Sequence, residues 1–88
     1  MRLPRNIGGK ELAKLLKKYG YSITRQTGSH IRLTSYFKGT EHHVSIPNHE
    51  PLRIGTLGNL LKDIASYLET DRQELLEELF FDNIRNLG

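Results

Sequence analysis

The first regular pattern of apolar residues in the chain has the period of a helix. Leu12, Leu15, Leu16 and Tyr19 are three or four residues apart, which is the spacing of one face of an α-helix. Gly20 follows, where a left-handed residue commonly ends a helix. Four lysines repeat the same spacing, offset from the apolar stripe by two residues: Lys10, Lys14, Lys17 and Lys18. We therefore predict a helix with one apolar and one cationic face.

The pattern then changes to short segments rich in β-branched and aromatic residues, which are typical of β-strands. We predict strands over residues 21–26, 30–36 and 42–46, with a turn at 27–29, a hairpin loop at 37–40 and a stop at Pro47. Because side chains alternate along a strand, Ile31 and Leu33 share one face, and His30 and Arg32 share the other.

The first strand contains one conflict with this alternation. Arg25 would lie on the same face as Ile23 in a regular strand. Two explanations stay open: the arginine swings out at the strand end, or a β-bulge shifts the register.

Two more amphipathic helices follow. The first begins near Gly55–Thr56 and has an apolar stripe of Leu57, Leu60, Leu61, Ile64 and Leu68. The second begins at Thr70, which forms a capping box with Gln73, and its stripe is Leu75, Leu76, Leu79 and Phe80. The order is α-β-β-β-α with an added C-terminal helix. It predicts an α+β fold in which helices cover one face of a three-stranded antiparallel sheet and leave the other face free to bind a ligand.

Length and composition limit the class of protein. Eighty-eight residues make one small domain. No apolar run approaches the ~20 residues of a membrane span, and residues 1–5 lack the apolar stretch of a secretory signal. The chain has no cysteine, which excludes disulfides and thiolate metal sites and fits a reducing compartment. We therefore expect a cytoplasmic protein that makes no contact with a membrane.

Charge is distributed unevenly along the chain. Residues 1–40 contain nine basic side chains and one acidic one, whereas residues 41–88 contain four basic and nine acidic ones. A basic first half suggests an anionic partner. The alternative is an ordinary solvated surface.

The segment Gly28-Ser29-His30 carries the candidate chemistry. Histidine transfers protons near neutral pH, and Arg32 on the same strand face suits a phosphate group. Ser29 would contact a phosphate oxygen or orient the imidazole, and Gly28 would allow close backbone approach. The free N–H groups at Gly55–Leu57 are a second candidate for holding an anion. The alternative for His30 is an exposed residue at a strand end.

The histidines His42, His43 and His49 raise the question of a metal site, but no such site is predicted. His42 and His43 are neighbours in a strand and point to opposite faces, so they do not readily share one ion. We also predict no cofactor, because the leucines of the three helices are accounted for as core.

An ordered set of segments resembles the HicA (YcfA-like) toxins of toxin–antitoxin modules. The segments are Gly9-Lys10-Glu11-Leu12, Gly20-Tyr21, Arg25-Gln26-Thr27-Gly28-Ser29-His30, Val44-Ser45-Ile46-Pro47-Asn48-His49, Gly55-Thr56-Leu57 and Leu60-Leu61-Lys62. The resemblance covers roughly residues 4–68. It implies a double-stranded-RNA-binding-domain-like fold, cleavage of mRNA with His30 as the catalytic histidine, and neutralisation by a HicB antitoxin. Residues 70–88 extend past this pattern.

We therefore expect residues 1–69 to form an RNA-binding and catalytic domain, and residues 70–88 to form a helical extension on or beside it. The expected activity is metal-independent cleavage of mRNA by His30. The RNA-binding candidates are Lys10, Lys14, Lys17, Lys18, Arg25, Gln26, Gly28, Ser29 and Arg32. The second proton-transfer group is not identified, with His43 as one option, and a homodimer is left open.

Two other functions stay open at this stage. The same surfaces suit a non-catalytic RNA-binding module. The chain also suits an interaction protein whose C-terminal helix docks on a partner.

Overall fold

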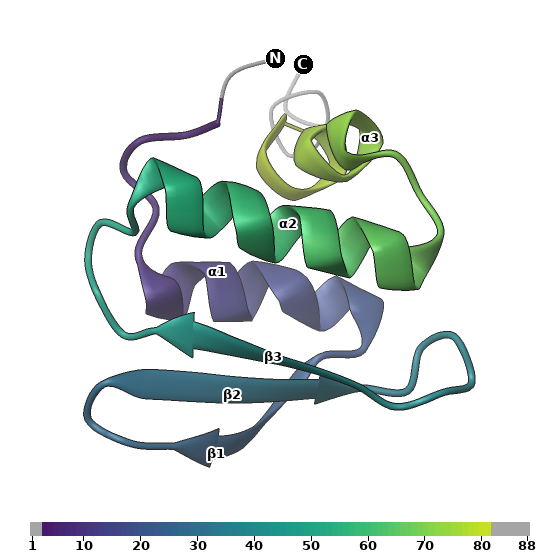
Figure 1. Cartoon of the computed structure of the whole chain (residues 1–88), viewed down its shortest axis with the longest axis horizontal. Coiled ribbons are helices and arrows are strands. Elements are labelled where there is room, and N and C mark those ends of the chain that lie inside the picture. The colour runs from purple at the N-terminus through teal and green to yellow at the C-terminus, as the bar shows by residue number, and fades with distance from the viewer. Residues whose placement is uncertain (1–2, 82–88) are drawn as a thin grey trace.

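Three strands follow a short helix and precede a long one, as the sequence pattern predicts. The computed structural model describes residues 3–81. Its elements are α1 (Gly9–Leu15), a 3₁₀ turn η1 (Leu16–Tyr19), β1 (Ser22–Gln26), β2 (His30–Ser35), β3 (His42–Pro47), α2 (Ile54–Leu68), α3 (Arg72–Leu76) and a π-helical turn η2 (Glu77–Phe81). The α-β-β-β-α order with an added helix is confirmed (Figure 1).

The strands form one antiparallel sheet in the order β1-β2-β3, so β1 is an edge strand. Ile31 and Leu33 are 1% and 0% exposed, whereas His30 and Arg32 are exposed. The predicted alternation is therefore confirmed over residues 30–33, and the last two residues of β2, Thr34 and Ser35, are both buried. The sheet has one face against the core and one open face.

A β-bulge resolves the conflict in β1. Ile23 pairs with Leu33 and Arg25 pairs with Arg32, so Thr24 is an extra residue without a partner position on β2. The extra residue moves Arg25 from the face of Ile23 to the open face of the sheet. Of the two explanations, the bulge is the one observed.

Helices α1 and α2 supply the core that covers the sheet. Most residues of the two predicted stripes are buried: Leu12, Leu16, Leu57 and Leu61 are all 0% exposed, and Leu15 and Leu60 are partly buried. Gly20 has a φ of 78° and ends η1 in the left-handed conformation, as predicted. No helix within residues 3–81 is long and apolar enough to cross a bilayer.

The C-terminal extension belongs to the same core. Helix α3 lies beyond α2, on its far side from the sheet (Figure 1). Leu75, Leu76 and Leu79 are at most 2% exposed and join the core cluster. The predicted helix is therefore packed on the domain; the remainder of the extension, residues 82–88, lies outside the described residues.

The start of α3 differs from the prediction. Asp71, not Thr70, is the N-cap, and its carboxylate accepts a hydrogen bond from the Gln73 backbone at 3.2 Å. The Thr70 hydroxyl instead donates to the carboxylate of Glu74 at 2.8 Å. Aspartate is as good an N-cap as threonine or better, and here it is the residue adjacent to the first helical position. The prediction of a capping box that begins at Thr70 was therefore wrong by one position.

Candidate active site

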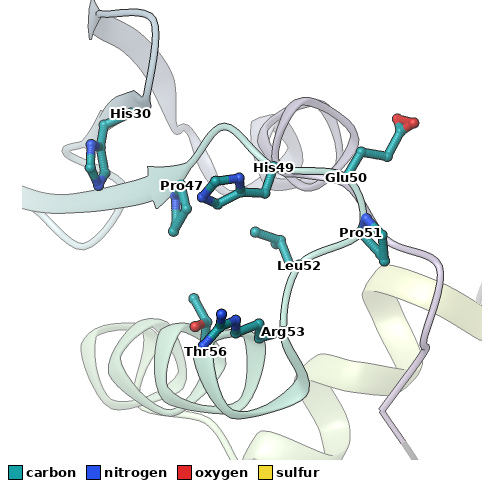
Figure 2. A pocket seen from close by; sticks show the side chains of 8 residues that line it. All are labelled: His30, Pro47, His49, Glu50, Pro51, Leu52, Arg53 and Thr56. Carbon is teal, nitrogen blue, oxygen red and sulfur yellow. The ribbon is translucent and has the colours of Figure 1, made fainter.

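A cleft lies between one end of the sheet and the start of α2. Its volume is about 460 Å³. The residues that line it include His30, Pro47, His49, Leu52, Arg53 and Thr56. Figure 2 shows His30 coming from β2, Arg53 and Thr56 from the start of α2, and His49 from the loop between β3 and α2. Side chains from three separate segments therefore meet at one cavity.

The turn before β2 holds His30 in place. The Thr27 hydroxyl accepts hydrogen bonds from the backbone N–H groups of Ser29 and His30, at 3.3 and 3.1 Å. Ser29 Oγ lies 3.1 Å from Nδ1 of His30, so it orients the imidazole, which was one of its two predicted roles. Within the described residues, Nε2 of His30 has no hydrogen-bond partner and is free to face a ligand.

The opposite wall of the cleft is tied to the same turn and to α1. The Asn48 N–H donates to the Ser29 carbonyl at 2.8 Å, and the Gly9 N–H donates to the His49 carbonyl at 2.9 Å. At Gly9 an added Cβ would lie 2.2 Å from the Pro47 carbonyl oxygen, so only glycine permits this approach. The two histidine-bearing segments are therefore fixed relative to each other by backbone contacts.

The groups in the cleft suit an anion. Two imidazoles, the Arg53 guanidinium and the Thr56 hydroxyl line it. Among the described lining residues Glu50 is the only acid, and its carboxylate points away from the cavity in Figure 2. The first turn of α2 contains no acidic side chain and no side-chain cap. Such a site favours a phosphate group flanked by proton-transfer groups.

The predicted partner Arg32 lies outside the cleft lining. It is exposed on the open face of the sheet, opposite Arg25 on β1 and Ser45 on β3. Gly28 has no atom within 4 Å of an added Cβ, so its backbone is open to a ligand. The two arginines form a cationic pair on the open face, with Arg32 two residues after His30 in β2 and Arg25 opposite it in β1.

Three of the four predicted lysines lie on the other side of β1. Lys10, Lys14 and Lys17 line a groove of about 240 Å³ that has Ala13, Ile23, Gln26 and Ile31 as its other walls. Gln26 pairs with the buried Ile31, so it faces this groove and not the open face that holds its neighbour Arg25.

Lys18 is not part of this cationic face. Its ammonium group donates to the Glu78 carbonyl at 2.6 Å, on the C-terminal turn η2. Because the helix tightens to a 3₁₀ turn at Leu16, the last residues no longer follow the spacing of an α-helix.

His43 is too far along the sheet to act with His30. It pairs with Thr34, whereas His30 pairs with Pro47, four positions along β2 and about 13 Å away at ~3.3 Å per residue. Its Nδ1 lies 2.8 Å from the Thr34 hydroxyl, and its Nε2 contacts Glu41. Hydrogen bonds from Tyr36 and then from His43 lower the pKa of the Glu41 carboxyl.

His42 has a structural role on the opposite side of β3. Burial raises the pKa of Tyr21 well above its usual range, and the Tyr21 hydroxyl forms a hydrogen bond with Nδ1 of His42 at 2.8 Å. The other ring nitrogen contacts Asp63 at 3.3 Å, and the ring stacks on Tyr67 with centroids 4.5 Å apart. Within residues 3–81 no group of three His, Asp or Glu side chains is placed to hold a metal ion.

One comparison with known proteins found a matching family. The model of a family described as HicA toxin of bacterial toxin–antitoxin matches residues 9–65. Neither the curated proteins nor the solved structures include a significant match. The matched region covers well over half of the chain and contains the whole lining of the cleft from His30 to Thr56.

Proposed function

Because the chain belongs to the family of HicA toxins of bacterial toxin–antitoxin systems, we propose that it is a metal-independent endoribonuclease that cleaves mRNA. The observation that carries the proposal is the cleft, where His30 lies at its edge with Nε2 free and a guanidinium lies on the opposite wall. These groups support the proposal because a guanidinium binds phosphate oxygens and an imidazole transfers protons.

The chemistry needs few groups, because RNA carries its own nucleophile. A base removes the proton of the 2′-hydroxyl, the 2′-oxygen attacks the neighbouring phosphorus, and the 5′-oxygen leaves with a proton from an acid. The products are a 2′,3′-cyclic phosphate and a 5′-hydroxyl. His30 supplies one of the two proton transfers, a contribution of about 10²–10⁴-fold in rate.

The test of this activity is incubation of a defined RNA with the purified protein, with and without EDTA. We expect fragments with 2′,3′-cyclic phosphate ends at the same rate in both. The measurement is gel analysis of end-labelled RNA with mapping of the new termini. A protein that binds RNA and leaves it intact in both conditions is the non-catalytic module, and the proposal of an enzyme then fails.

The cations flanking β1 are proposed to hold the RNA backbone. Arg25 and Arg32 lie on the open face of the sheet, and Lys10, Lys14 and Lys17 line the groove on the other side of the same strand. RNA that runs along this edge contacts both groups through its phosphates. Such contacts bind by shape and charge rather than by base sequence.

Replacing Lys14 by alanine is expected to weaken RNA binding and to make it less sensitive to salt. Log affinity falls with log salt, and each lost phosphate contact makes this slope less steep by about 0.7–0.9. The measurement is RNA affinity at several salt concentrations in a His30→Ala background, which prevents cleavage. Lys62→Ala, an exposed lysine on α2, is the matched control and should leave the slope unchanged. Equal slopes for both variants would contradict a role for the groove.

A HicB-like antitoxin is the proposed protein partner, because membership of a toxin family implies an antitoxin that keeps the toxin inactive. The proposed substrate places this pair in the cytoplasm. The alternative in which the C-terminal helix docks on a partner has less apolar surface to use than the sequence pattern suggested, since Leu75, Leu76 and Leu79 are buried in the domain's own core.

A further inference from the structure

Cleavage by a 2′-hydroxyl needs two proton transfers, and one imidazole performs one of them at a time. The second group has to reach the same phosphodiester as His30. Within the described residues the cleft contains one other side chain that exchanges protons near neutral pH, the imidazole of His49. The first requirement, shared access to one cavity, is therefore met.

The position of His49 is built into the fold. Its carbonyl accepts the hydrogen bond from Gly9 at the start of α1, and its neighbour Asn48 is bonded to Ser29, the residue before His30. Figure 2 shows the rings of His30 and His49 on the same side of the start of α2, with Pro47 drawn between them. The ring of His49 has no hydrogen bond to any described residue, so both of its nitrogens are available.

The other lining groups do not compete for the role. The guanidinium of Arg53 offers a fork of donors to a phosphate and accepts no hydrogen bond, so it suits charge stabilisation. The carboxylate of Glu50 points out of the cavity. The Thr56 hydroxyl is neither a base nor an acid of useful strength, and it donates or accepts a hydrogen bond.

We propose that His49 is the second catalytic residue and that His30 and His49 divide the two proton transfers between them. This inference rests on the proposed ribonuclease activity. One neutral imidazole takes the 2′-hydroxyl proton as the bond from the 2′-oxygen to phosphorus forms. The other, protonated, gives its proton to the 5′-oxygen as the bond from phosphorus to that oxygen breaks. Arg53 contacts the phosphate oxygens, whose charge grows in the transition state.

The pH dependence of cleavage separates a catalytic His49 from a structural one. With one imidazole neutral and the other protonated, the wild-type rate should rise and then fall with pH. His49→Ala should lose about 10²–10⁴-fold in rate and one of the two limbs. Added imidazole should restore part of this rate. His43→Ala, which removes an exposed histidine at the far end of the sheet, is the control and should keep the wild-type profile.

A substrate with a better leaving group identifies the acid. RNA with a bridging 5′-sulfur at one phosphodiester needs no proton on its leaving group. We therefore expect this substrate to restore the rate of one of the two variants, His30→Ala or His49→Ala, and not of the other. Thermal melts of both variants should match the wild type, because both side chains are exposed.

The outcomes distinguish the inference from the activity on which it rests. If the wild type leaves RNA intact, the proposed function fails. Suppose instead that the wild type cleaves RNA and His30→Ala is inactive. If folded His49→Ala then keeps the wild-type rate and both limbs of the pH profile, the pairing with His49 is overturned and the ribonuclease activity stands. The pairing is also overturned by a second result. In that result His49→Ala cleaves more slowly with an unchanged pH profile, and neither imidazole nor the sulfur substrate restores the cleavage rate of either variant.

Discussion

Replacing His30 by alanine should abolish growth inhibition and lower the rate of RNA cleavage by about 10²–10⁴-fold, the usual contribution of a positioned proton-transfer group. The domain should remain folded. His30 is exposed at the first position of β2, and its side chain bonds only to the hydroxyl of its neighbour Ser29 among the described residues. The strand itself is held by backbone pairing with β1 and β3 on both sides.

The measurement is cleavage of a defined RNA by wild type and variant, together with growth on induction of each. His30→Gln is a second variant that keeps a hydrogen-bonding side chain of similar size but transfers no proton near neutral pH. It should be as inactive as His30→Ala. Thermal denaturation of both variants serves as the folding control. Wild-type cleavage by either folded variant would remove His30 from the mechanism.

Replacing Leu76 by alanine should lower the free energy of unfolding by about 2–5 kcal/mol, the cost of removing a buried leucine side chain and leaving a cavity. Leu76 is 0% exposed and belongs to the core cluster that includes residues from the sheet and from α2. Small domains have only about 5–15 kcal/mol of stability in total. The loss is therefore large enough to reduce the amount of folded protein in the cell.

The measurement is urea denaturation of Leu76→Ala beside Gln73→Ala, an exposed position on the same helix. Gln73→Ala should change stability by less than about 0.5 kcal/mol, as is usual for surface substitutions. A loss below about 1 kcal/mol for Leu76→Ala would show that α3 is an accessory segment.

Local patterns predicted the elements because each depends on residues close together in the chain. Apolar spacing located the helices, alternation placed His30 opposite to Ile31, and Gly20 marked a left-handed helix end. The same reasoning failed at the start of α3, where two neighbouring residues are nearly equally good N-caps. Thr70 and Asp71 are both good N-caps, and in the structure Asp71 takes the position.

The candidate site was predicted only in part. His30, Ser29 and Gly28 stand out because they adjoin a strand in one short segment. In the sequence, His49 was noted only as part of the segment from Val44 to His49 and as one of three histidines considered for a metal site, without a catalytic role. Gln26 and Arg25 are neighbours in sequence, yet they lie on opposite faces of β1, and this was not foreseen in grouping them as RNA contacts.

The sequence alone therefore determined the order of elements, the buried and exposed faces of β2 and the identity of His30 as the candidate proton carrier. The tertiary structure alone decided what surrounds that histidine. His49 and Arg53 reach the same cleft because the loop after β3 is bonded both to Gly9 and to the turn before His30. Such proximity depends on strand register and on the packing of helices, which involve residues far apart in the chain and leave no periodic signal in the sequence.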